Sequence, residues 1–178
     1  MTVRDYKITP RHSRKPLSSA LLLVLFLISH PIWAGQREED LTLSALKEVD
    51  AVALRSSSLD AFGKATLSQS TVILDLGSQA QAPLLRFLND RQQDWMTRYW
   101  VADMLGYIGD QSALEGLLQV VRKRGENAQI RMRCLDSIEG ISARGKNRRE
   151  ISRRLKLSLK QVENAQVRKK VKEVLRKL

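Results

Sequence analysis

Few side chains of this chain suit acid–base, nucleophilic or metal chemistry near neutral pH. The 178 residues include two histidines, His12 and His30, and one cysteine, Cys134. Both histidines lie within residues 1–34, which have the features of a removable export signal. Without that segment, no Ser-His, Cys-His or histidine–metal site can form. Ser-Lys or carboxylate chemistry is left open, but no motif for it is present. We therefore expect a protein that is not an enzyme and that holds no cofactor and no metal.

The chemistry that remains is the binding of anions by basic side chains. Residues 144–178 contain 14 Lys and Arg against 3 Glu, a net charge of +11, whereas residues 35–143 contain 12 basic and 15 acidic residues, a net charge of −3. Such an asymmetry favours an acidic partner or surface. The alternative is a basic but merely solvated end of the domain. The candidate contacts at this end are Arg153, Arg154, Lys169 and Lys170.

The pattern that predicts the helices of this chain is clearest in residues 94–121. Apolar residues with a 3.6-residue period predict a first helix there: Val101, Met104, Leu105 and Ile108. A second helix has its own stripe: Leu114, Leu117, Leu118 and Val121. Between them, we expect Gly109 to end the first helix in a left-handed conformation and Asp110 to cap the second. One such pair cannot bury both stripes, so neighbouring pairs are expected.

The sequence repeats this pattern on both sides. Residues 72–88 have the same order of apolar residues, and Gly77 stands one repeat before Gly109. Cys134 stands one repeat after Val101, so we interpret it as a small core residue and not as a reactive thiol. The segment Glu126–Arg131 recurs almost unchanged at 163–168. A period in the thirties made of paired helices indicates an all-α fold of the α-solenoid type.

These residues also carry a family resemblance. Residues 94–121 resemble a HEAT repeat of the phycobilisome-lyase type, through Asp94-Trp95, Arg98, Ala102, Leu105-Gly106, Ile108-Gly109-Asp110 and Ala113. The resemblance is fair over 70–90 and 127–141 and covers about half of the chain. It implies a curved stack of antiparallel helix pairs that binds other proteins on the surface made by the second helices. On that pattern the candidate contacts are Arg86, Gln119 and Arg122, extended by Arg153 and Arg154.

Residues 1–34 have the order typical of a secretory signal. A basic leader precedes the apolar run 21–28, and Ala34 stands before a plausible cleavage point. The apolar run is shorter than the ~20 residues that a membrane-spanning helix needs. We therefore expect a signal peptide over 1–34 and one mature domain over 35–178, in the periplasm or secreted. The alternative is an uncleaved anchor in the inner membrane that faces the periplasm.

Three functions follow as hypotheses. The first is a small exported adaptor or scaffold that binds another, acidic protein, with an anionic envelope surface as a further candidate partner. The second is a subunit of a lyase-like enzyme, which the resemblance implies, although an export signal does not fit pigment attachment in the cytosol. The third is a nucleic-acid or polyanion binder that uses the basic C-terminal helices. Export argues against nucleic acid as the partner.

Overall fold

The computed structural model describes residues 19–145 and 147–178, and for residues 19–34 it describes the backbone alone. Residues 1–18 of the predicted export signal therefore lie outside the described residues. The first helix, α1 (Ser19–Ala53), continues through the predicted cleavage point after Ala34. No helix among the described residues is long and apolar enough to cross a bilayer. The contacts of the chain separate one domain, Gly35–Leu178, from the residues before it.

The domain is all-helical, as the sequence predicted, and the described residues include no strand. The 3₁₀ helix η1 (Gly77–Ala80) precedes α4. The helices after α1 are α2 (Leu59–Ala65), α3 (Leu67–Leu76), α4 (Gln81–Asn89), α5 (Trp95–Ile108), α6 (Ala113–Arg122), α7 (Ala128–Arg144), α8 (Arg148–Leu159) and α9 (Ala165–Lys177).

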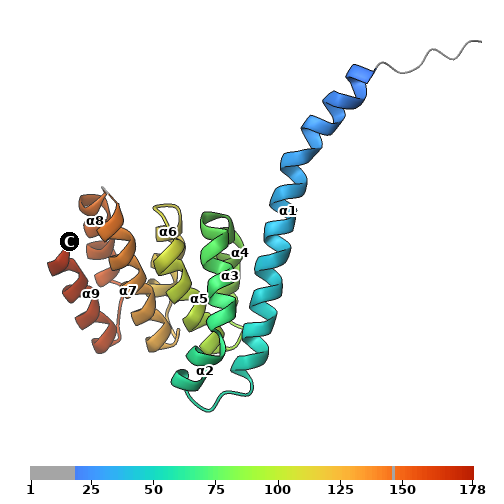
Figure 1. The fold of residues 1–178 in the computed structure, drawn as a ribbon. Helices are drawn as coiled ribbons and strands as arrows, with labels where there is room; N and C mark the ends of the chain where they lie inside the picture. The colour runs from blue at the N-terminus through green and yellow to red at the C-terminus, as the bar shows by residue number, and fades with distance from the viewer. Residues whose placement is uncertain (1–18, 146) are drawn as a thin grey trace, which may run out of the picture. The chain divides into compact units, whose positions relative to one another are not determined.

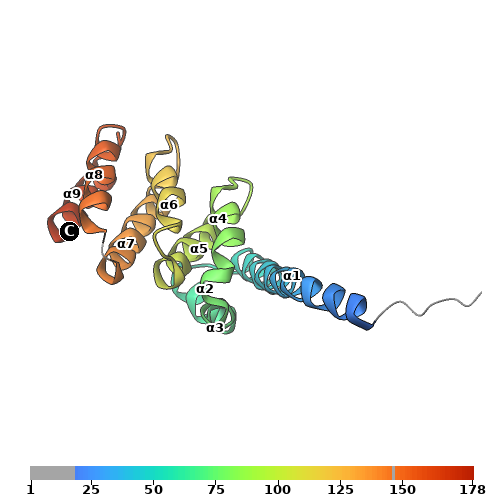
Figure 2. The same cartoon turned by 90° about the horizontal axis from the view of Figure 1, so that it is seen from above.

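The helices from α3 onward form two rows (Figures 1 and 2). In one row α3, α5, α7 and α9 pack side by side, and in the other α4, α6 and α8 do so. The rows are joined by contacts of α4 with α5, of α6 with α7, and of α8 with both α7 and α9. Each helix in the middle of a row therefore has neighbours before it, after it and across from it, which is how each apolar stripe becomes buried.

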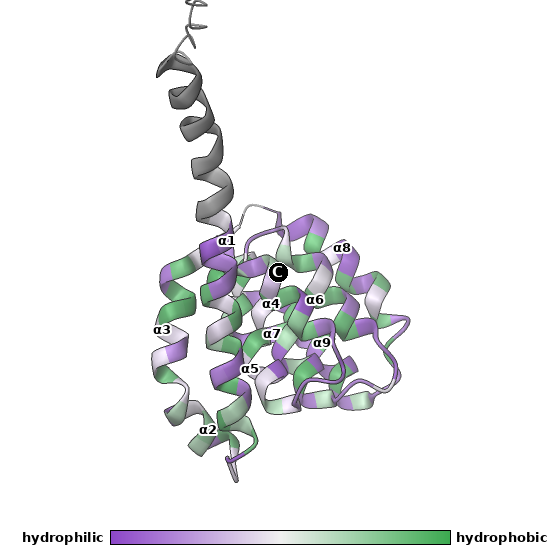
Figure 3. Ribbon diagram, turned by 90° about the vertical axis from the view of Figure 1, so that its right-hand side faces the viewer, coloured by the Kyte–Doolittle hydropathy of each residue, from purple (hydrophilic) through white to green (hydrophobic). Residues whose placement is uncertain are grey.

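The predicted stripes lie at the centre of these contacts. Val101 and Leu105 of α5, Leu117 of α6 and Cys134 of α7 are completely buried. Hydrophobic and hydrophilic residues are interspersed along the helices of the domain (Figure 3). Helix α5, in the middle of a row, is buried over most of its length. Burial raises the pKa of the Cys134 thiol, so this side chain is an inert core residue, as predicted.

Gly77 and Gly109, which stand one repeat apart, end their helices in different ways. Gly77 ends α3 with a φ of 56°, in the left-handed region that glycine adopts without strain. Gly109 ends α5 as predicted, but the predicted left-handed conformation is wrong, because its φ of −66° and ψ of 146° are extended. Close packing explains this glycine instead: a Cβ here would overlap the Leu105 carbonyl oxygen and would lie 3.0 Å from Cδ1 of Ile141. Helix α6 begins at Ala113, and the Asp110 carboxylate accepts a 2.7 Å hydrogen bond from the Ser112 N–H.

One structural device recurs at the start of α5, α7 and α9. Each helix follows an Asp or Asn whose side chain caps it, namely Asp94, Asn127 and Asn164. Four positions after each cap stands an arginine whose Nε donates to a carbonyl near the end of the preceding helix. Arg98 bonds to Leu88 O at 2.9 Å, Arg131 to Val121 O at 2.8 Å and Arg168 to Val162 O at 3.1 Å. Leu88 and Val121 lie in the last turn of α4 and of α6, where carbonyls have no partner within their own helix, and Val162 lies in the loop that follows α8. Each arginine thus ties one helix pair to the next.

Candidate partner-binding surface

The seven predicted contact residues lie in both rows of helices. Arg86 of α4, Gln119 and Arg122 of α6, and Arg153 and Arg154 of α8 belong to one row. Lys169 and Lys170 belong to α9, in the other row. Gln119 is exposed on α6, and Arg86 is exposed and forms an ion pair with Glu39 of α1. The structure therefore does not bring all seven residues together, and it divides them between two sides of the domain.

Two of the predicted contacts meet in one network between α6 and α8. Arg122 donates to Glu115 at 3.2 Å and, through Nε, to the Ser158 hydroxyl at 2.8 Å. Arg154 donates to the other Glu115 oxygen at 3.0 Å and to Glu150 at 2.6 Å. Both arginines are only partly exposed. They link neighbouring helices of the row, so much of their hydrogen-bonding capacity is used within the chain.

Arg153 extends this network toward solvent. It donates two hydrogen bonds to Glu150, at 2.8 and 2.7 Å. Hydrogen bonds from Arg153 and then Arg154 lower the pKa of Glu150 to about 2. Glu150 is thus ionised throughout the physiological range and offsets one of the two positive charges beside it. The Arg153 side chain is still 65% exposed, so it is accessible to a partner as well.

In the other row, the two neighbouring lysines of α9 differ. Lys170 forms a 2.6 Å ion pair with Asp136 of α7 and a second, at 3.7 Å, with Glu173. The hydrogen bond to Asp136 is the main cause that raises the pKa of Lys170. Lys169 is exposed, and no carboxylate of the described residues forms an ion pair with it. Lys170 is therefore an internal contact, whereas Lys169 faces solvent.

The charge that is left over lies mainly at the C-terminal end. Residues 35–75 have a net charge of −3, with 4 basic and 7 acidic residues, and residues 76–143 are neutral, with 8 of each. Among the described residues of the +11 end, the cations that form ion pairs are Arg153, Arg154, Lys170 and Lys177. Exposed cations without a carboxylate partner in that described part include Arg148, Arg149, Lys156, Lys160, Lys169 and Lys172.

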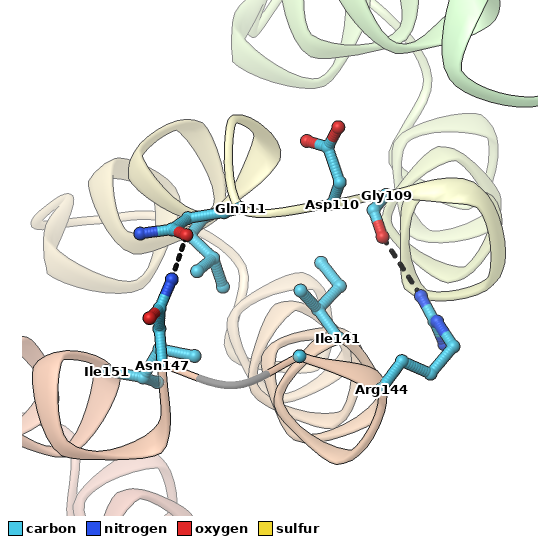
Figure 4. Close-up of a pocket in the computed structure, with 9 residues that line it drawn as sticks. Gly109, Asp110, Gln111, Ile141, Arg144, Asn147 and Ile151 are labelled. Atoms are coloured by element: carbon cyan, nitrogen blue, oxygen red, sulfur yellow. Dashed lines mark hydrogen bonds between the residues drawn. The ribbon is translucent and has the colours of Figure 1, made fainter.

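The crevice between the α5–α6 turn and the α7–α8 turn has a volume of about 190 Å³ (Figure 4). Ile141 and Ile151 form its apolar part. Its polar side chains already have partners: Arg144 donates to Gly109 O at 3.0 Å, and Asn147 donates to Gln111. The rim thus binds one turn to the other and leaves few polar groups for a ligand.

Two further hollows lie beside the C-terminal residue Leu178. One, of about 300 Å³, is lined by Arg148, Arg149, Ser152, Arg153, Lys156 and Leu178. The other shares Arg148, Arg149 and Leu178 with it. Three of the lining cations lack a carboxylate partner among the described residues. These hollows therefore offer more unpaired positive charge to an anionic group than the crevice of Figure 4 does, where Arg144 is the lining cation.

The sequence patterns did not indicate that the domain contains a buried ion pair. Arg98 and Glu126 have side chains that are 5% and 3% exposed, and two hydrogen bonds of 3.0 and 2.6 Å join them. Burial acts to raise the pKa of Glu126, but hydrogen bonds from Arg98 and from the Asn127 N–H outweigh it and hold the pKa below its usual value. The signal that could have revealed the pair was the repeated Glu-Asn-Ala-Gln segment, in which Glu126 directly precedes the helix cap.

Within the described residues, no cluster of three or more His, Cys, Asp or Glu side chains could hold a metal ion. Comparison of the chain with protein-family models, with curated proteins and with solved structures finds no match. The resemblance to a HEAT repeat therefore rests on the residues of this chain alone.

Proposed function

We propose that the chain is a small exported adaptor of the HEAT-repeat type, which binds an acidic protein through its basic C-terminal end. The observation that carries this proposal is the distribution of charge along the helices. The net charge is −3 over residues 35–75, zero over 76–143 and +11 over 144–178. A folded end with charge of one sign raises the local concentration of an oppositely charged partner and speeds their encounter.

The solenoid interpretation is supported by the two rows of helices and by the arginine that recurs after the caps of α5, α7 and α9. A stack held by contacts between neighbouring pairs offers an extended surface for another protein. Export to the periplasm is supported by the basic, apolar and small-residue order of residues 1–34. In that compartment, acidic proteins and anionic envelope surfaces are available partners, and chromosomal DNA is not.

Crosslinking in intact cells, followed by mass spectrometry, tests this function. Four exposed cations of the basic end are replaced by Gln in one variant: Lys156, Lys160, Lys169 and Lys172. The matched control replaces four exposed cations nearer the N-terminus: Arg37, Lys47, Arg55 and Lys64. We expect the first variant to lose acidic crosslinked partners and the control to keep them. Equal capture by both variants would contradict the proposal, as would crosslinks dominated by nucleic acid.

The export step has its own test. We expect the envelope form of the protein to begin near Gly35, which N-terminal sequencing would detect. Recovery of an intact Met1 in the soluble cytoplasmic fraction would contradict export. Recovery of the intact chain in the inner membrane would instead favour the anchored alternative.

A further inference from the structure

Four cations of the basic end lie along one side of α8, the last of them at its C-cap, Lys160. Arg149, Arg153, Lys156 and Lys160 follow one another at i, i+4, i+7 and i+11, which places them in one line on a helix. All four are exposed, whereas Ile151 and Leu155, on the opposite side of the helix, are 2% and 0% exposed. We call these four residues the α8 stripe.

Most of the charge of the α8 stripe is available to a partner. Among the described residues, no carboxylate forms an ion pair with Arg149, Lys156 or Lys160. Arg153 is the member that is already paired, with Glu150. Glu150 offsets the charge of Arg153. The other three positive charges of the stripe are not neutralised by any carboxylate of the described residues.

The spacing of the stripe resembles that of an extended peptide. At 1.5 Å per residue, the stripe spans roughly 16 Å, in steps of roughly 6, 4.5 and 6 Å. Side chains on one face of an extended chain recur about every 6.6 Å. A heptapeptide segment with a carboxylate at every second position can therefore place its acids opposite successive cations, and the long Arg and Lys side chains accommodate the small mismatch.

The surroundings of the stripe include apolar surface as well as charge. Leu157, beside the stripe on α8, is 50% exposed. At the other end of α8, the hollow of about 300 Å³ places Leu178 among Arg148, Arg149 and Lys156. Apolar surface next to cations suits a peptide with mixed side chains better than a phosphate polymer, whose charged backbone dominates its contacts.

A second copy of the chain fits this surface poorly. Residues 35–178 contain 26 basic and 18 acidic residues, a net charge of +8. The most acidic part of the domain, residues 35–75, has a net charge of only −3. Two copies would therefore repel each other at long range, which favours a different and acidic chain as the occupant.

We infer that the α8 stripe is a recognition site for an extended acidic peptide segment with carboxylates at alternate positions. The inference rests on the proposed function and deepens it, because it names the helix face and the form of the ligand. Successive cations of the stripe pair with alternate carboxylates of the segment, and the hollow beside Leu178 binds one end of it.

Binding of two labelled heptapeptides to the full-length protein tests the inference. One is Glu-Ser-Glu-Ser-Glu-Ser-Glu, and the other has the same composition in the order Glu-Glu-Glu-Glu-Ser-Ser-Ser. In the clustered peptide, alternate side chains point away from the helix, so about half of its carboxylates reach the stripe. We expect the alternating peptide to bind roughly two- to tenfold more tightly, which corresponds to two further exposed ion pairs. Fluorescence anisotropy at low salt measures both affinities.

Two variants with equal loss of charge provide the control. One replaces Arg149, Lys156 and Lys160 by Gln, and the other replaces three exposed cations of α9, which are Lys169, Lys172 and Arg176. Circular dichroism first establishes that both are folded. The stripe variant should lose the preference for the alternating peptide, and the α9 variant should keep it. Equal affinities for the two peptides, or the same loss in both variants, would overturn the inference.

A third probe separates peptide from phosphate recognition. A short oligothymidylate with four phosphates has about the same charge as the peptides. Tighter binding of this oligonucleotide than of the alternating peptide, lost in the stripe variant, would assign the stripe to a phosphate polymer and overturn the peptide assignment. If crosslinking in cells still captures an acidic protein through the basic end while the peptides show no dependence on the stripe, the inference fails and the proposed function stands.

Discussion

The start of α5 and the outer side of α8 both contain arginines, but the two regions use them differently. Arg98 is buried, donates to Leu88 O and has Glu126 as a fully matched partner. On α8, Arg153 is largely exposed, and Arg149 has no carboxylate partner among the described residues. The first region uses charge to join helix pairs, whereas the second leaves charge available in solvent. Net charge alone does not separate these uses, because burial and partners decide them.

The largest effect is expected from a substitution in the apolar core, on which the fold of both regions depends. Leu105 is completely buried in α5, so Leu105→Asp places a charge in the core without a partner, at a cost of several kcal/mol. We expect the variant to be unfolded at room temperature by circular dichroism. Tyr107→Asp is the matched control, because Tyr107 lies on the same helix and is 61% exposed. A folded Leu105→Asp variant with an unchanged melting temperature would show that the apolar stripe of α5 is assigned incorrectly.

The second largest effect is expected when the buried ion pair of Arg98 and Glu126 is broken. Arg98→Ala leaves Glu126 buried without its partner, which we expect to destabilise the domain by about 3–5 kcal/mol. Arg124→Ala removes an ion pair with Glu163 whose side chains are 80% and 66% exposed, and such pairs contribute only about 0–1 kcal/mol. Urea denaturation of both variants measures the difference. Equal losses would contradict the contrast between buried and exposed charge.

The same pair predicts an acid dependence. The pKa of Glu126 is lower in the folded domain than its usual value of 4.5. In the window between the two values, the unfolded chain binds more protons than the folded one, so stability falls as pH decreases. The contribution of Glu126 is complete above pH 4.5 and is lost as pH falls through the folded pKa. We expect Glu126→Gln to be less stable at neutral pH and to lose less stability on acidification, as measured by urea denaturation from pH 7 to pH 3.

Two glycines should respond to alanine with opposite signs. In Gly109→Ala, the new Cβ overlaps Leu105 O, and the shift that this forces should destabilise the domain by about 1–3 kcal/mol. Gly63 lies within α2 with no atom within 4 Å of a new Cβ. Gly63→Ala should therefore stabilise the domain by about 0.5–1 kcal/mol through helix propensity. Thermal melts of both variants measure the two changes. A shift of the melting temperature in the same direction for both would contradict the role of packing at Gly109.

The helices could be predicted from the sequence because their signals are local. The stripe of Val101 and Leu105 and the repeat offset that placed Cys134 in the core depend on spacing within or between helices, and both predictions were confirmed. The extended conformation of Gly109 was not predicted, because the spacing of apolar residues does not determine the backbone conformation after a helix ends. A Cβ at Gly109 would first meet the Leu105 carbonyl oxygen of its own helix and then Ile141 of the next helix pair, and the second of these contacts depends on packing between helices.

The candidate surface was less predictable, for the same reason. Lys170 was selected by the charge of its segment, and Arg154 by that charge and by the family resemblance, but their partners Glu115 and Asp136 lie in earlier helices, α6 and α7. Only the packing of α8 on α6, and of α9 on α7, shows which cations are already paired. The sequence predicted which end of the domain is basic, and the arrangement of the helices identified the cations that remain free among the described residues.

A smaller effect than that of the buried pair is expected for Arg122, whose exposure is intermediate between those of Arg98 and Arg153. Its side chain is 26% exposed and bonds to Glu115 and Ser158. Arg122→Ala should destabilise the domain by about 0.5–1.5 kcal/mol, since the Ser158 hydroxyl also donates to Arg154 O at 2.9 Å and is not left without a partner. Arg153→Ala, at a more exposed position, should cost less, because solvent screens an exposed ion pair. The difference between the two variants should shrink in 1 M salt, because charges there interact over only about 3 Å before the salt screens them. If Arg122→Ala instead destabilises the domain as much as Arg98→Ala, the network between α6 and α8 holds the stack together as a buried pair does, and Arg122 is no candidate for partner binding.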